Sequence, residues 1–227
     1  MIRLHIIAEG QTERNFVNTV LRPHLAEFTV FVDARCVLTS KDRRKAKVYR
    51  GGLLSYEKAK KDIQAWLKED YHGECRFSTM FDLYALPDDF PECAEASTQK
   101  DPYERIRILE KAMADDIKDS RFVPYIQLHE FEALILSDPQ QLEWEYLEHD
   151  TPIQNLIKMA GTQNPELIND GQETAPSKRI LKEIPEYDKA TSGVAVARHI
   201  GLEKLRERCR HFGEWVSRLE NLDRPPS

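Results

Sequence analysis

The chain is poor in cysteine, and its thiols are scattered. Its four cysteines are Cys36, Cys75, Cys93 and Cys209, and no two of them form a C-x-x-C pair. Disulfide frameworks and tetrahedral zinc sites usually show closely spaced thiols, so the spacing predicts neither. We therefore interpret these cysteines as reduced thiols, which are typical of a cytoplasmic protein.

Long apolar runs are also absent. Apolar segments such as residues 133–136 fall far short of the roughly 20 residues that cross a bilayer. Residues 1–8 lack the basic region, long apolar segment and small-residue cleavage site of a secretory signal. The sequence therefore predicts a protein without membrane attachment.

Basic residues are also fewer than acidic residues. The 227 residues include 33 Lys and Arg against 39 Asp and Glu, which gives a formal net charge of −6. Proteins that grip nucleic acid by broad phosphate neutralisation usually carry a basic surplus, so the balance weighs against that class. A metal-dependent nuclease is not excluded, because its clustered carboxylates lower the net charge themselves.

Short apolar runs alternate with helical patterns in the first part of the chain. Apolar and β-branched runs predict strands at residues 3–8, 29–37, 76–83 and 122–128. Helices are predicted between them, after Thr12, over residues 55–68 and over residues 102–117. Pro23 interrupts the first of these helices and predicts a kink or break. The alternation is typical of an α/β fold with a mostly parallel sheet flanked by helices.

Strand patterns stop at Phe131, and prolines separate the short helical segments that follow. We therefore expect an α/β core over residues 1–137 and a helical extension over residues 138–227. The extension is expected to pack on the core, so that both form one compact unit.

Acidic residues follow three of the four predicted strands. Glu9 follows the first strand, Asp82 ends the third, and Glu130 and Glu132 follow the fourth. The carboxyl ends of parallel strands share one edge of the sheet, where ligands bind, and carboxylates there favour Mg²⁺ or Mn²⁺. Glu13 is one helical turn past Glu9 and can face the same cleft as a catalytic acid or base. Each acid taken alone also fits a helix cap or a solvated loop.

Two further candidates lie outside this pattern. Asp89, in the proline-rich and acidic loop at residues 87–92, could supply another metal ligand or simply form a turn. Lys178 could stabilise transition-state charge or mark the solvated start of a helix.

A basic loop is predicted between the second strand and the helix at residues 55–68. Its positive residues are Lys41, Arg43, Arg44, Lys45, Lys47 and Arg50, and Gly51 and Gly52 close it. These charges could contact the phosphates of DNA or RNA, in which case binding weakens steeply with salt. The alternative is a solvated, flexible loop.

Short motifs follow one another along nearly the whole chain. They are Glu9-Gly10-Gln11-Thr12-Glu13, Arg50-Gly51-Gly52, Phe81-Asp82-Leu83-Tyr84, His129-Glu130-Phe131-Glu132, Ser177-Lys178-Arg179, Tyr187-Asp188-Lys189, Ile200-Gly201-Leu202 and Cys209-Arg210-His211-Phe212. In this order they resemble a bacterial family of unknown function that is usually classed as Toprim-like (domain of unknown function 4276).

The resemblance implies a Toprim-like, Rossmann-like fold, as in topoisomerases, bacterial primases and nucleases of the overcoming-lysogenization-defect type. In that fold a glutamate after the first strand does acid/base work or binds metal, and aspartates after a later strand hold magnesium. Glu9 and Asp82 match these positions, but Tyr84 replaces the second aspartate of the usual Asp-x-Asp pair. Asp88, Asp89 or the acids after the fourth strand would have to supply the missing carboxylate, or the site is inactive.

The resemblance also implies an ATPase partner of the AAA or ABC type and a role in defence against phage. Two hypotheses follow from the residues and the resemblance together. The chain is a Mg²⁺-dependent nuclease, or it is a non-catalytic partner that regulates the ATPase. A small-molecule phosphohydrolase that uses the same acidic edge is a third alternative.

Overall fold

The computed structural model describes residues 1–42, 47–50, 53–168 and 174–223. Its sheet consists of β1 (Ile2–Ala8), β2 (Val30–Cys36), β5 (Cys75–Asp82), β6 (Phe122–Val123) and β7 (Ile126–Gln127). The strand order is β2-β1-β5-β6, and β7 also pairs with β5. Every pair in this sheet is parallel. The predicted α/β fold with a mostly parallel sheet is confirmed.

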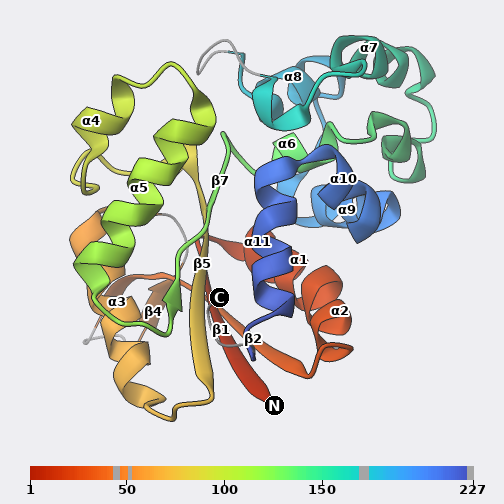
Figure 1. Cartoon of the computed structure of the whole chain (residues 1–227). Coiled ribbons are helices and arrows are strands. Elements are labelled where there is room, and N and C mark those ends of the chain that lie inside the picture. The colour runs from red at the N-terminus through yellow and green to blue at the C-terminus, as the bar shows by residue number, and fades with distance from the viewer. Residues whose placement is uncertain (43–46, 51–52, 169–173, 224–227) are drawn as a thin grey trace.

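Helices cover both faces of the sheet (Figure 1). One face carries α3 (Tyr56–Glu69), α4 (Cys93–Ser97) and α5 (Pro102–Ile117). The other face carries α1 (Gln11–Phe16), α2 (Arg22–Ala26) and α11 (Arg210–Glu220).

Alternation along β1 divides the core between these two layers, because successive side chains of a strand point to opposite faces. Leu4 and Ile6 belong to the apolar cluster on the α1 side, whereas Ile7 belongs to the cluster on the α3 side.

The first helix changes its hydrogen bonding before the proline, as the predicted break requires. A π-helical turn, η1 (Val17–Leu21), joins α1 to α2, and Pro23 lies in the first turn of α2. A proline is tolerated there because the first turn of a helix does not need its N–H group.

The fourth strand was predicted as one continuous run over residues 122–128, and this prediction is wrong. The structure breaks it into β6 and β7 at Pro124 and Tyr125. Proline cannot donate to a strand ladder, and the Tyr125 N–H donates to the Thr79 hydroxyl instead (2.9 Å).

Further short helices lie in the described part of the chain. They are η2 (Leu83–Ala85), α6 (Glu132–Ile135), η3 (Pro139–Trp144), α7 (Asp150–Ala160), η4 (Pro165–Leu167), α8 (Pro176–Glu183), η6 (Lys189–Gly193), α9 (Val194–Ile200) and α10 (Leu202–Arg208). Val196 and Leu219 from this part share one apolar cluster with Leu4 of β1. The division at residue 137 stays a prediction.

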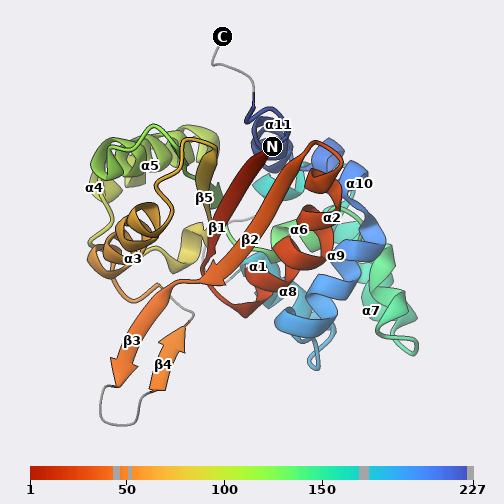
Figure 2. The same ribbon diagram turned by 90° about the horizontal axis from the view of Figure 1, so that it is seen from below.

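The basic segment was expected to be a loop, and the structure corrects this expectation. Its described residues form two antiparallel strands, β3 (Leu38–Asp42) and β4 (Lys47–Arg50), a hairpin that extends from the end of β2 (Figure 2). β-branched and aromatic residues such as Thr39, Val48 and Tyr49 favour strands over loops.

No helix in the described parts of the chain is long and apolar enough to cross a bilayer.

Candidate metal centre

Two parallel strands and two helices bring four acids together at the carboxyl edge of the sheet. Glu9 follows β1, Asp82 is the last residue of β5, and Glu132 begins α6 shortly after β7. Glu13 comes from the first turn of α1. Apart from β1 and α1, these elements are far apart in sequence, so the cluster depends on the order of strands in the sheet.

Lys189 lies in the middle of this cluster. Its Nζ atom is 2.7 Å from Asp82 Oδ2, 3.4 Å from Glu132 Oε2 and 3.5 Å from Glu13 Oε1. Its side chain is 34% exposed, so it reaches the acids from the solvent side. We define these five residues, the four acids and Lys189, as the acidic cluster.

Backbone hydrogen bonds hold two of the carboxylates in place. The Asp82 N–H donates to Glu9 Oε2 (3.0 Å), and the Gly10 N–H donates to Glu13 Oε2 (2.9 Å). Glu13 thereby forms a capping box at the start of α1. Each bond fixes one carboxylate oxygen and leaves the other for a neighbour in the cluster.

Burial leaves other carboxylate oxygens without a hydrogen-bond donor. Glu13 and Asp82 are 3% exposed, and Glu132 is 1% exposed. Among the described residues, Asp82 Oδ1 and Glu132 Oε1 have no hydrogen-bond partner. Unpaired buried carboxylate oxygens are costly, so these atoms require either protons or a cation.

The protonation of the acids reflects this shortage of donors. Burial, together with the charges of Asp82 and Glu13, raises the pKa of Glu9 to about 8. Burial raises the pKa of Glu132 to about 8 in spite of the opposing charge of Lys189. Burial and the charge of Asp82 also raise the pKa of Glu13. Burial opposes the charge on Lys189, but Asp82, Glu132 and Glu13 outweigh it and raise its pKa.

This donor set fits a hard divalent cation. Mg²⁺ and Mn²⁺ prefer carboxylate oxygens, and Mg²⁺ usually binds proteins through a few carboxylates while it keeps several waters. The unpaired oxygens of Asp82 and Glu132 are buried acceptors of this kind. Glu9, Asp82 and Glu132 are therefore the residues that could hold such an ion.

The structure places the other candidates outside the acidic cluster. Asp89 accepts hydrogen bonds from the Tyr56 N–H (2.8 Å) and the Glu57 N–H (3.4 Å), so it caps α3. Glu130 accepts a hydrogen bond from the Ser177 N–H. Lys178 is exposed on α8.

Lys189 was not among the site residues predicted from the sequence, although it belongs to the Tyr187-Asp188-Lys189 motif. It stands more than fifty positions after Glu132, in a π-helical turn that apolar periodicity does not indicate. The one sequence feature that could have indicated Lys189 is its place, as a basic residue, in a family motif to which no role had been given.

Tyr84 stands where an Asp-x-Asp pair would place its second carboxylate. Its ring packs against His129 with the ring centres 5.4 Å apart. His129 has a φ of 62°, and its carbonyl accepts a hydrogen bond from the Tyr84 N–H (3.0 Å). Burial lowers the pKa of His129 to about 4, which keeps its ring neutral near pH 7. This pair holds the turn between β7 and α6 against the end of β5.

A family model described as a domain of unknown function (DUF4276) matches residues 8–220 of the chain. The chain belongs to this family. Family membership confirms the motif resemblance, whereas the Toprim-like label stays a prediction. No curated protein matches the chain. Among solved structures, the C-terminal region of the OLD protein of Xanthomonas campestris pv. campestris matches with a TM-score of 0.42 and 14% identity, covering 96% of this chain and 97% of that chain.

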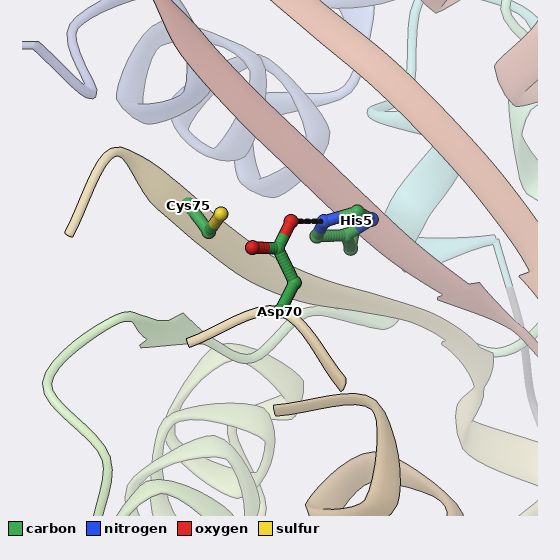
Figure 3. A group of neighbouring side chains, drawn as sticks. All are labelled: His5, Asp70 and Cys75. Atoms are coloured by element: carbon green, nitrogen blue, oxygen red, sulfur yellow. Dashed lines mark hydrogen bonds and ion pairs between the residues drawn. The ribbon is translucent and has the colours of Figure 1, made fainter. Parts of the chain in front are cut away.

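A second group of candidate metal ligands lies at the other end of β5. His5, Asp70 and Cys75 each offer one ligand atom, and these atoms lie within 4.8 Å of one another (Figure 3). The spacing of cysteines did not indicate this group, because His5 and Asp70 reach it from β1 and from the end of α3.

This second group already contains a cation. Arg3 Nη2 donates to Asp70 Oδ1 (2.9 Å) and to Cys75 Sγ (3.2 Å). Asp70 Oδ2 lies 2.8 Å from His5 Nε2, and Asp70 Oδ1 lies 3.0 Å from His72 Nδ1. The carboxylate is thus surrounded by donors, unlike the acids of the acidic cluster.

Proposed function

We propose that the chain binds Mg²⁺ or Mn²⁺ at the acidic cluster and hydrolyses phosphodiester bonds of DNA or RNA. The observation that carries this proposal is the approach of three buried carboxylates, from α1, β5 and α6, to within 3.5 Å of one ammonium group. Structural acids seldom gather in excess of their cations in a buried place, whereas metal-dependent hydrolases require this arrangement.

Glu9, Asp82 and Glu132 are proposed as metal ligands. When bound there, a divalent ion supplies an acidified water and neutralises charge on the scissile phosphate. The Asp82 N–H fixes the Glu9 carboxylate at the end of β5, beside the Asp82 side chain.

Glu13 and Lys189 are proposed to act on the substrate side. Glu13 is held by the Gly10 N–H through one oxygen, and burial together with the charge of Asp82 raises its pKa, which favours the protonated form that a general acid needs. Lys189 has a partly exposed side chain that ends in an ammonium group on a long stem, so it can contact a phosphate oxygen of the substrate. It takes the role that the sequence analysis proposed for Lys178.

The hairpin of β3 and β4 supports a nucleic-acid substrate. It carries Lys41, Lys47 and Arg50 and leaves the sheet at the carboxyl end of β2, the edge on which the acids lie. Arg43, Arg44 and Lys45, also proposed as contacts, lie outside the described residues. Binding through these charges is expected to weaken steeply as salt increases.

The family resemblance supports an ATPase partner of the AAA or ABC type. It also leaves a second function open, in which the domain regulates that ATPase without catalysis. The replacement of the second aspartate by Tyr84, which packs on His129, favours this alternative.

Cleavage assays separate the two functions. We expect the wild-type chain to nick supercoiled DNA or cut labelled RNA only with Mg²⁺ or Mn²⁺, and Asp82→Asn and Glu132→Gln to lose this activity. Asp115→Asn, which removes an exposed acid of α5, is the matched control and should keep it. Equal cleavage by all four proteins would point to a contaminant and contradict the proposal. Metal binding without cleavage of either substrate would favour the regulatory function.

A further inference from the structure

Lys189 Nζ occupies the position toward which the carboxylates of the acidic cluster point. It is hydrogen-bonded to Asp82 Oδ2 at 2.7 Å and paired with Glu132 and Glu13 at 3.4 and 3.5 Å. An ammonium and a divalent cation that share the same oxygens repel each other strongly at such distances. The oxygens that contact the ammonium can therefore bind only one of the two cations at a time.

We infer that Lys189 is a tethered counterion of the metal-free site, and that a divalent metal binds in exchange for its ammonium group. This inference rests on the proposed function, because it concerns the same acidic cluster. Without metal, the Lys189 ammonium competes with the ion for the carboxylates. Once metal is bound, the ammonium is released from them.

The local structure allows the ammonium to leave without unfolding the turn that carries it. Lys189 is the first residue of η6, and Asp188 Oδ1 caps this turn by accepting from the Thr191 N–H (2.8 Å) and hydroxyl (2.7 Å). These bonds hold the backbone and do not involve the Lys189 side chain. That side chain is a flexible stem, 34% exposed, so rotation can take the ammonium into solvent.

The released ammonium stays near the site, because its backbone is fixed there. Phe131, which precedes Glu132, has its ring centre 6.0 Å from Nζ and offers an aromatic face beside the cluster. The exchange thus links two events: a metal enters the cluster, and a positive group becomes available to the phosphate of a substrate. A site without metal would hold the lysine back from the substrate.

Metal titration tests the competition. Mn²⁺ binding is measured by calorimetry for the full chain, for Lys189→Met and for Lys189→Arg, with Lys182→Met as the matched control for loss of an exposed lysine on α8. We expect Lys189→Met to bind at least about tenfold more tightly, since apparent affinity scales with the fraction of competent sites. Lys189→Arg and Lys182→Met should bind like the wild type. Equal binding by Lys189→Met and wild type would overturn the exchange and leave the metal site standing. No binding by any of them would overturn the proposed function as well.

Lysine labelling of the wild-type chain tests the movement directly and needs no variant to fold. Reductive methylation followed by mass spectrometry is compared with and without saturating Mg²⁺. We expect Lys189 to be labelled slowly without metal and several-fold faster with it, while Lys182 is labelled equally in both. An unchanged rate at Lys189 under conditions where the metal binds would overturn the inference.

Discussion

The acidic cluster and the His5–Asp70–Cys75 group lie at opposite ends of β5. They differ in how many hydrogen-bond donors and cations surround their buried carboxylates. At Asp70, donors outnumber the carboxylate: Arg3, His5 and His72 all lie within 3.0 Å of its oxygens. Burial alone would raise the pKa of Asp70, but hydrogen bonds from Cys75, His5 and His72 and the charge of Arg3 hold it well below its usual range.

In the acidic cluster the carboxylates outnumber the cation. Three of the four acids contact the one ammonium, unpaired oxygens remain on Asp82 and Glu132, and the pKa values of Glu9 and Glu132 rise to about 8. The comparison teaches that buried acids alone do not identify a metal site. The balance of donors and acceptors is the more useful criterion: it predicts a stabilising role for Asp70 and supports the cation binding that we propose for the acidic cluster.

The largest expected effect is on metal-dependent cleavage. Asp82→Asn should lower it by at least about 100-fold, because a ligand with an unpaired oxygen is lost. Asp70→Asn should leave the rate per folded molecule unchanged. Cleavage rates at saturating Mn²⁺ measure the difference, and a comparable loss in both variants would break the distinction between the two groups.

Substitutions in the two groups should have the reverse order of effect on stability. Asp70→Asn should lower the free energy of unfolding by about 2 kcal/mol, because Arg3, His5 and His72 lose a charged acceptor. Glu132→Gln should leave the metal-free protein as stable as the wild type or more so, since it removes a poorly paired buried acid. Urea unfolding in a chelator tests both, and a Glu132→Gln protein less stable than Asp70→Asn would contradict the account.

Stability of the metal-free protein should also fall as pH rises. Glu9 and Glu132 have a pKa of about 8 in the fold against an ordinary value of 4.5, so the folded state binds more protons between these values. Their contribution is fully present below pH 4.5 and is lost as pH rises through about 8. We expect a Tm lower by on the order of 5 °C at pH 9 than at pH 6. The Glu9→Gln/Glu132→Gln double variant should lose most of this slope, and an unchanged slope would be inconsistent with the raised pKa values.

The smallest expected effect concerns Arg3, whose side chain is 45% exposed. Arg3→Gln should cost only about 0.5 kcal/mol, because exposed ion pairs contribute little and His5 and His72 still contact Asp70. Thermal unfolding at pH 7 measures it. A loss as large as that of Asp70→Asn would mean that Arg3 alone satisfies the carboxylate.

The sequence predicted the parts of the site that depend on strand order. Glu9 and Asp82 follow strands whose apolar runs are plain, and parallel pairing brings their carboxyl ends to one edge. Glu132 could be placed for the same reason, although Pro124 divides the strand before it.

Other parts could not be predicted, because they depend on tertiary contacts. Whether Asp89 binds metal or caps a helix depends on how close the first residues of α3 lie to its carboxylate. In the structure the Tyr56 N–H donates to Asp89, so Asp89 caps the helix. Lys189 joins acids more than fifty positions earlier in the chain through the packing of η6. The Asp70 group likewise draws on two separate strands and a helix end.

Anomalous diffraction from a crystal of the wild-type chain soaked in Mn²⁺ tests the central claim most directly. The account predicts a manganese peak bound by Asp82 and Glu132, with Lys189 Nζ moved out from between them, and no peak at Asp70. A peak at Asp70 instead, or an acidic cluster that still holds Lys189 and no manganese at saturating concentration, would contradict it.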